Sequence, residues 1–272
     1  MSDVFLLSES QMKRIEPFFP LAHGVPRVDD RRVLSGIVYV IRNGLQWKDA
    51  PKAYGPHKTL YNRFIRWNRL GVFDRIFKTL AEQAGRSKRL MIDATHLKAH
   101  RTAASLLKKG LFPRHTGRTK RGLNSKLHAM CDDQGRPVRL HLTAGQVSDF
   151  KGADALLADL PDKTEEIIGD RGYDSNRIRL LLAERTITAC IPPKKNRKSK
   201  PPYDWHLHKK RHLIENMFAK LKDWRRVATR YDRCAHTFMS AIHIAASFIF
   251  YLKECVLSLR PLYLQQCAGL FS

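Results

Sequence analysis

Three acidic residues occupy positions where two strands are expected to end and one helix is expected to run. Asp93 closes the short apolar run RLMID, Asp170 closes the apolar segment TEEIIGD, and Glu215 lies in the strongly basic stretch RHLIENMFAKLKDWRR. In an open α/β sheet the carboxyl ends of neighbouring parallel strands lie together, and ligand sites form there. If these two strands are neighbours, Asp93 and Asp170 lie side by side, and a helix crossing that edge adds Glu215.

Such a group of carboxylates needs a cation. Two unit charges ~4 Å apart repel each other by about 4 kcal/mol at an effective dielectric constant of about 20. A bound divalent ion is the simplest way to offset this repulsion. Oxygen ligands without a Cys or His set favour Mg²⁺ or Mn²⁺ over Zn²⁺.

Each acid also has an ordinary structural interpretation. Asp93 can cap a helix that begins at THLKAH, and Asp170 can be a turn residue in GDRGYDS. Glu215 can pair with Arg211 one helical turn earlier, a contact typically worth only ~0.2 to 0.5 kcal/mol. The coincidence of all three acids at suitable topological positions favours the metal site over three separate structural roles.

Two histidines beside Asp93 offer a competing metal site. His96 and His100 have the i, i+4 spacing that a zinc site on a helix requires. A third ligand is not evident nearby, so packing or a phosphate contact is the favoured role for this pair.

The apolar pattern predicts an N-terminal helical region followed by a mixed α/β sheet. The first 85 or so residues have helical periodicity. Beyond residue 87 the predicted order is strand, strand, strand, helix, strand, helix, strand, helix, which is typical of the α/β class. Within it, LHAMCDDQGRPVRLHLTAG is predicted to be a hairpin that turns at Asp133-Gln134-Gly135, and Asp149 is predicted to cap the helix FKGADALLADL.

The helical region contains a pattern typical of a helix-turn-helix DNA-binding domain. A helix from Asp29 is predicted to stop at Gly44, and a second helix, HKTLYNRFIRWNRLG, follows a short connection. The apolar face of the second helix carries Leu60, Phe64 and Trp67, and its opposite face carries Asn62, Arg66 and Arg69. A small helical bundle with a polar exterior would show the same pattern, but the charge of the chain favours DNA.

That charge is large and positive. The 50 Lys+Arg against 25 Asp+Glu give a formal net charge of +25 and imply an extended anionic partner, with nucleic acid as the first candidate. A ribosomal-type basic protein would share this charge. Residues 108–122 and 192–202 hold six and five Lys/Arg without an acid. We expect both segments to be exposed loops, either solvated linkers or arms that grip phosphate.

The remaining features indicate a reduced cytoplasmic, nucleoid-associated protein. The five cysteines form no C-x-x-C pair, and the N-terminus lacks the features of a secretory signal. The long apolar run from Ala235 is interrupted by Ser240, His243 and Ser247, so a buried helix is a better interpretation than a membrane span.

Several motifs together are similar to those of a known family. They are MIDATHLKAH, GRTKRGLNSKLHAM, RPVRLHLTAGQVSDFKGA, IGDRGYDS and HKKRHLIENMFAKLKDWRRVATRYDR, with WKDAP and YNRFIRW nearer the N-terminus. In this combination the chain resembles the DDE transposases of bacterial insertion sequences, specifically the fifth of the large families. The resemblance runs to about residue 250 and implies an RNase H-like catalytic core. We therefore expect a helix-turn-helix-like DNA-binding domain at 1–85, an RNase H-like catalytic domain at 86–260 and a C-terminal tail at 261–272.

The resemblance also implies the site residues. It carries the catalytic and metal-binding carboxylates of the family onto Asp93, Asp170 and Glu215, which would hold two Mg²⁺ ions, with Mn²⁺ as a substitute. The last family motif is a spaced Tyr, Arg, Glu, Lys set. Here Arg211, Glu215 and Lys222 match it, and His208 stands at the tyrosine position. On one helix these four residues would share a stripe. DNA contacts are expected from His208, Arg211, Lys222, Arg225 and Arg226.

The implied function is DNA transposition. A protein of this kind binds the terminal inverted repeats of an insertion sequence, cleaves strands there and joins the freed 3′-hydroxyls to target DNA. Its partner is double-stranded DNA, on which we expect a dimer or larger assembly. Two alternatives remain open: a non-catalytic helix-turn-helix regulator derived from a transposase, and an RNase H-like nuclease that cuts without joining.

Overall fold

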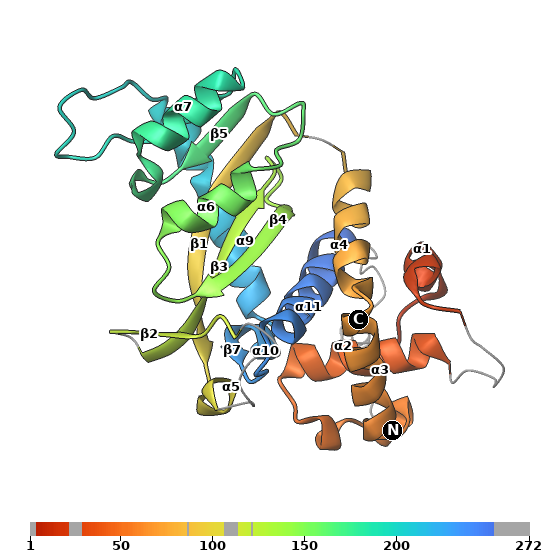
Figure 1. The fold of residues 1–272 in the computed structure, drawn as a ribbon. Coiled ribbons are helices and arrows are strands. Elements are labelled where there is room, and N and C mark those ends of the chain that lie inside the picture. Colours follow the sequence, from red (N-terminus) through yellow and green to blue (C-terminus); the bar gives the residue numbers. More distant parts are fainter. Residues whose placement is uncertain (1–3, 22–28, 86, 106–113, 121, 253–272) are drawn as a thin grey trace, which may run out of the picture.

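The computed structural model describes residues 4–21, 29–85, 87–105, 114–120 and 122–252. A group of N-terminal helices packs against a sheet that has helices on both faces (Figure 1). The predicted tail at 261–272 and residues 108–113 and 121 of the first basic segment lie outside the described residues.

The N-terminal region is helical, as predicted. Its elements are α1 (Glu9–Ile15), η1 (Glu16–Phe18), α2 (Asp30–Asn43), η2 (Trp47–Asp49), η3 (Lys52–Tyr54), α3 (His57–Arg69) and α4 (Val72–Gln83). Helix α2 begins at its N-cap Asp29 and ends at Gly44, whose φ of 69° is a left-handed conformation that glycine adopts without strain. The connection between α2 and α3 contains two 3₁₀ turns, so it is longer than the tight turn of a typical helix-turn-helix motif.

The sheet confirms the predicted mixed α/β class and the RNase H-like arrangement. Its strands are β1 (Arg89–Ala99), β2 (Gly117–Thr119), β3 (Gly122–Cys131), β4 (Pro137–Ala144), β5 (Glu166–Gly169), β6 (Thr188–Cys190) and β7 (Thr229–Arg230). The order β2-β3-β1-β5-β6 places β1 at the centre, antiparallel to β3 and parallel to β5. Strand β4 pairs with β3, and β7 pairs with β1.

Helices cover the two faces of this sheet (Figure 1). On one face lie α6 (Asp149–Leu157) and α7 (Asn176–Glu184), over a core that includes Ile92 and Met130. On the other face lie α9 (His212–Lys222), α10 (Arg225–Ala228) and α11 (Ala235–Ala246). The short elements are α5 (Arg101–Ala104), η4 (Arg171–Tyr173), α8 (Trp205–His208), η5 (Lys209–Arg211) and the π-turn η6 (Ser247–Tyr251).

One continuous apolar core joins the N-terminal helices to the α9 face of the sheet. It extends from Leu34 and Trp67 through Phe238 of α11 to Leu97 and Leu127 of the sheet. Helix α11 is therefore the buried helix expected from the apolar run. Across the described ranges, no helix is long and apolar enough to cross a membrane.

Three expectations about the elements were wrong. Strand β1 does not end at Asp93 but continues to Ala99, because β3 pairs with it from Met91 to Lys98. The described part of the basic segment 108–122 is not only a loop, since β2 pairs there with β3. Asp149 is the first residue of α6 rather than its cap, and the N-cap position is held by Ser148, whose side chain makes no capping hydrogen bond.

Candidate active site

Asp93 and Asp170 lie next to each other because β1 and β5 are parallel neighbours. The register pairs Ile92 of β1 with Gly169 of β5, so Asp93 and Asp170 are the residues that follow this pair. Neighbouring strands are about 4.8 Å apart. The condition on which the sequence prediction of a shared site depended is therefore met.

Asp93 is held by two donors. Its Oδ1 accepts from the backbone N–H of Ala94 at 2.8 Å, and its Oδ2 accepts from Nη2 of Arg211 at 2.8 Å. The side chain is 15% exposed. Burial raises the pKa of Asp93 above its ordinary value. Arg211 and the Ala94 amide oppose this rise, and the neighbouring Asp170 adds to it.

Arg211 links Asp93 to Glu215. The same Nη2 atom that binds Asp93 lies 3.1 Å from Oε1 of Glu215, on the first turn of α9. Both carboxylates therefore lie within contact distance of a single nitrogen. Burial disfavours the charge of Arg211, but Asp93, Glu215 and Asp170 together raise its pKa. Glu215 itself is 58% exposed, so the site opens to solvent on its side.

Asp170 is both a capping residue and a member of this group. Its Oδ1 accepts from the N–H of Gly172 at 2.8 Å, which caps the turn η4. In the same turn, Tyr173 is 2% exposed and its hydroxyl has no hydrogen-bond partner among the described residues. Burial, together with the charges of Asp93, Asp149 and Asp170, raises the pKa of Tyr173. Sequence reasoning missed Tyr173, for which the only signal was its place in GDRGYDS.

The four residues of the predicted stripe do not lie on one regular helix, because the 3₁₀ turn η5 precedes α9. Lys222, the last residue of α9, donates from Nζ to Oγ1 of Thr95 at 2.6 Å, and burial lowers its pKa. His208 belongs to α8 and is separated from α9 by the 3₁₀ turn η5. Burial, with the charge of Arg211 adding, lowers the pKa of His208, whose ring meets that of Tyr203 edge-on at 5.7 Å.

The donor chemistry at this place suits Mg²⁺ or Mn²⁺, because three carboxylates contribute only oxygen. Within the described ranges, no three His, Cys, Asp or Glu residues form a group that could hold a metal. Here Arg211 supplies the positive charge between Asp93 and Glu215. The residues therefore fit a divalent ion in type, and a closer approach of Glu215 would complete the set.

The competing histidine pair does not form a helical site. His96 lies on β1, where its Nε2 lies 3.1 Å from the carbonyl oxygen of Gly145. His100 is the N-cap of α5. Because β1 runs through His96 to Ala99 and His100 follows it as an N-cap, the pair does not lie on one helix, and the prediction of a helical zinc site is wrong.

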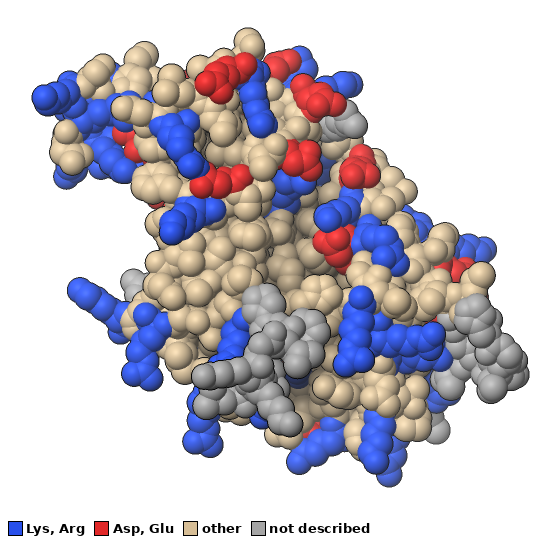
Figure 2. All heavy atoms as spheres, in the orientation of Figure 1, with Lys and Arg blue, Asp and Glu red and all other residues tan. Residues whose placement is uncertain are grey.

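The predicted DNA-contacting residues differ in exposure. On α3, Leu60, Phe64 and Trp67 are fully buried, whereas Asn62, Arg66 and Arg69 are exposed, as is Arg225 on α10. The lower half of Figure 2, where α2, α3 and β2 lie, shows many basic and few acidic side chains.

Arg226 differs from the other predicted contacts because it is 7% exposed. It donates to the carbonyl oxygen of Leu45 and to Asp232, each at 3.0 Å, and lies over the ring of Trp47. Arg226 is thus a structural residue, and its predicted DNA contact has no support in this structure.

A buried acid that sequence reasoning missed holds the second basic segment. The side chain of Asp174 is 0% exposed and accepts from the Lys194 amide, from Arg179 and from Arg197. Burial alone would raise the pKa of Asp174, but these three donors lower it on balance. The loop 192–202, which projects beside α7 in Figure 1, is therefore fixed at its base.

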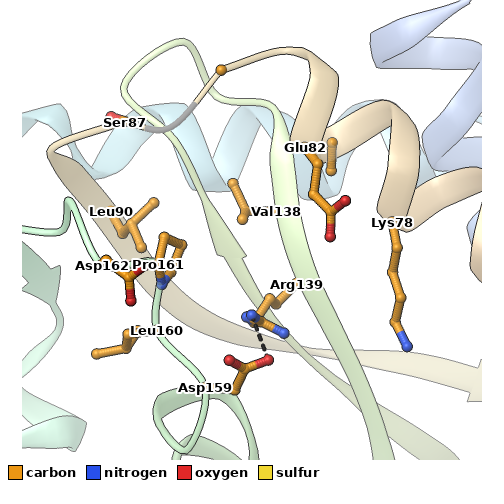
Figure 3. Close-up of a pocket in the computed structure, with 12 residues that line it drawn as sticks. Lys78, Glu82, Ser87, Leu90, Val138, Arg139, Asp159, Leu160, Pro161 and Asp162 are labelled. Atoms are coloured by element: carbon orange, nitrogen blue, oxygen red, sulfur yellow. Dashed lines mark ion pairs between the residues drawn. The ribbon is translucent and has the colours of Figure 1, made fainter.

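A cavity of about 350 Å³ lies away from these carboxylates (Figure 3). It is lined by α4, by β4 and by the segment from Asp159 to Asp162, with Arg139 and Asp159 paired across it at 2.7 Å. None of the predicted site residues lines it.

Two known protein families match this chain. Residues 7–77 match the family described as "Putative transposase of IS4/5 family", and residues 85–249 match the family described as "Transposase DDE domain". The chain belongs to the DDE transposase family. Both matches agree with the resemblance of the motifs, and the second covers Asp93, Asp170 and Glu215.

Individual relatives of this DDE transposase are of the same kind. It is 37% identical over 129 residues to a "Putative transposase for insertion sequence element IS6501" of Brucella ovis, covering 47% of this chain and 98% of the relative. It is 30% identical over 133 residues to a "Putative transposase for insertion sequence element IS402" of Burkholderia cepacia, covering 45% and 60%.

Among solved structures, the transposase is similar to two Mos1 complexes. One is a pre-cleavage Mos1 transpososome, at 12% identity and a TM-score of 0.25 over 84% of this chain and 79% of that chain. The other is a Mos1 mariner paired-end complex with Mn, at 13% identity and a TM-score of 0.27 over 88% and 83%.

Proposed function

We propose that this chain is a DNA transposase that binds the terminal inverted repeats of an insertion sequence, cleaves strands there and joins them to target DNA. Asp93, Asp170 and Glu215 are the catalytic and metal-binding residues. The observation that carries the proposal is the parallel register of β1 and β5, which makes the two aspartates neighbours, with Arg211 joining Asp93 to Glu215.

Two Mg²⁺ ions, or Mn²⁺ in their place, would be held by the three carboxylates. When bound, they would lower the pKa of a water or a 3′-hydroxyl and stabilise the leaving oxygen. The protein itself orients the carboxylates, because the amides of Ala94 and Gly172 each hold one oxygen of an aspartate. No covalent intermediate with the protein is needed.

Basic residues around the carboxylates position the DNA. Arg211 and Lys222 bracket Glu215 on the α9 side and are able to donate to phosphates, which fixes the register of the strand. His208 is a weaker contact, because burial favours its neutral form. Farther away, Asn62, Arg66, Arg69 and Arg225 present exposed side chains to the duplex.

The partner is double-stranded DNA, both as element ends and as target. The net charge of +25 supplies the attraction to phosphates. Since two ends of an element must be handled together, we propose a dimer or larger assembly on DNA. Action on chromosomal DNA places the protein in the cytoplasm, at the nucleoid.

The test is a cleavage and joining assay on the DNA that flanks the gene, with Mg²⁺ present or chelated. Wild type should cleave and join only with Mg²⁺, and Glu215→Ala and Asp170→Ala should bind the ends but cut nothing. Binding without cleavage by wild type would indicate a non-catalytic regulator. Cleavage without joined product on paired ends would indicate a nuclease, and cleavage by Glu215→Ala would remove the site assignment.

A further inference from the structure

A second hollow lies on the N-terminal helices, apart from the carboxylates. It has a volume of about 350 Å³ and lies between the turn η2 and the first half of α3. Six residues line it: Trp47, Lys48, His57, Lys58, Tyr61 and Asn62. The six comprise two aromatic rings, two lysines, a histidine and an amide, and none of them is an acid.

The aromatic wall of this hollow is held in place from behind. The ring of Trp47 lies 5.2 Å from that of the buried Phe64 and 5.6 Å from that of Tyr61, at an interplanar angle of 62° to the latter. The guanidinium of Arg226 lies 5.4 Å from the Trp47 ring centroid, and Arg226 is itself bound to Leu45 and Asp232. A segment far along the chain therefore fixes Trp47, and a ligand meets a wall that is already ordered.

Tyr61 is the exposed aromatic residue of this lining. It is 45% exposed, a large value for an aromatic side chain, and it lies next to Asn62 on α3. The exposed face of α3 continues from Lys58 and Asn62 to Arg66 and Arg69. The hollow is therefore continuous with the helix face to which we assign the duplex contact.

The residue types that line the hollow indicate the chemical class of its ligand. An aromatic wall offers stacking to a flat ring, the amide of Asn62 both donates and accepts hydrogen bonds, and Lys48 and Lys58 attract an anion. A DNA base with its flanking phosphates combines these three properties. We propose that the hollow binds one unstacked base of the DNA strand that lies along α3, a proposal that rests on the proposed function of α3 in DNA binding.

Whether the bound base comes from duplex or from single-stranded DNA depends on two free energies, that of unpairing and that of stacking. Taking a paired base out of a duplex costs a free energy of the same order as the gain from stacking it on an aromatic side chain. A base that is already unpaired avoids this cost. The hollow should therefore prefer single-stranded or distorted DNA over intact duplex.

The test compares two single strands about ten nucleotides long. One is oligothymidylate, and the other has the same backbone with abasic sites in place of the bases. Because the phosphates are identical, the attraction to net charge is the same for both. Wild type should bind the thymidine strand roughly 5- to 150-fold more tightly, the range expected for stacking of one base. Tyr61→Ser should lose most of this preference, and Tyr61→Phe should keep it.

Trp205→Ser is the matched control, since Trp205 is another exposed aromatic residue, at 53%, and does not line the hollow. It should leave the preference unchanged. In addition, a strand containing 5-iodouracil should photo-crosslink to Tyr61 or Trp47, as located by mass spectrometry. Equal affinity of wild type for both strands, or a full preference in Tyr61→Ser, would overturn the proposal.

The cleavage assay separates this inference from the proposed function. If wild type cleaves element ends with Mg²⁺ but binds both strands equally, the base-binding hollow is refuted and the transposase activity stands. If the thymidine preference depends on Tyr61 but no Mg²⁺-dependent cleavage occurs, the hollow stands and the catalytic proposal fails.

Discussion

Replacing Arg211 with Gln should destabilise the protein in the absence of metal, and Mg²⁺ should reverse much of the loss. Arg211 is the basic group through which the structure joins Asp93 to Glu215, and its Nη2 lies 2.8 Å and 3.1 Å from their oxygens. Glutamine keeps part of the side-chain length but carries no charge. Asp93, whose side chain is 15% exposed in this structure, would then lie beside Asp170 without its cationic partner.

The magnitude follows from the burial of the pair. Removing one partner of a fully buried ion pair costs about 3 to 5 kcal/mol, whereas a surface pair contributes about 0 to 1 kcal/mol. The Arg211 side chain is 22% exposed and that of Asp93 is 15% exposed, so the pair is mostly buried. We expect a loss of about 2 to 3 kcal/mol. For a chain of this size, that lowers Tm by about 4 to 12 °C.

The assay is thermal unfolding in a chelator and in Mg²⁺. In the chelator, Arg211→Gln should melt lower than wild type by this amount. Adding Asp93→Asn should recover part of the loss, because the buried charge is then removed as well. In Mg²⁺ the variant should gain more stability than wild type, since a cation no longer competes with the guanidinium for the carboxylates.

Arg66→Gln, which neutralises an exposed arginine of α3, is the control and should change Tm little in either condition. Two results would refute the reasoning. One is an Arg211→Gln variant as stable as wild type in the chelator. The other is an equal increase of Tm with Mg²⁺ in both proteins, which would mean that Arg211 does not occupy the position of a cation.

Four further predictions concern other parts of the molecule. Asp174→Asn should speed tryptic cleavage between residues 194 and 200 by about 10- to 150-fold, because charged hydrogen bonds of ~1.5 to 3 kcal/mol are lost. Asp159→Asn, at an 81% exposed side chain, should not change the cleavage rate. Because the pKa of Asp174 is lowered in the folded state, the stabilisation from this carboxylate is present above its unfolded pKa and is lost as pH falls through its folded pKa. Hydrogen exchange at the Lys194 amide, which donates to Asp174, should report this loss. An exchange rate that does not depend on pH in this range, once corrected for intrinsic rates, would contradict the prediction. Gly152→Ala places a Cβ 2.1 Å from Nδ1 of His128 and should lower the free energy of unfolding, measured by thermal unfolding, by about 1 to 3 kcal/mol. Ala155→Ser, at an exposed position of the same helix, should leave the stability unchanged. Arg66→Gln and Arg69→Gln should each reduce the slope of log affinity against log salt concentration by about one, and an unchanged slope would remove α3 from the DNA interface.

The sequence was sufficient to predict the order of the elements and the neighbouring aspartates. Alternation and turn residues marked β3, β4 and the hairpin at Gly135, whose φ is 72°. The helical spacing of Leu60, Phe64 and Trp67 correctly separated the buried face of α3 from its exposed face. These signals are local, because each depends on residues a few positions apart.

Features that depend on distant residues could not be predicted. The length of β1 is set by its pairing with β3, and the burial of Arg226 is set by Trp47, whose position the local sequence does not fix. The hydrogen bonds that hold Asp174 include one from Arg197, which lies in a segment whose composition indicates only an exposed loop. Likewise, the i, i+4 spacing indicated an ion pair between Arg211 and Glu215. Only the fold shows that Nη2 of Arg211, which makes this pair, also donates to Asp93.

The most direct test of the central claim is to measure Mn²⁺ binding to the protein on element-end DNA by electron paramagnetic resonance, in wild type and in Asp93→Asn, Asp170→Asn and Glu215→Gln. If the three carboxylates form one centre, wild type binds Mn²⁺ and each variant loses most of that binding while still binding DNA. Wild-type Mn²⁺ binding in any one of the three variants would contradict the account.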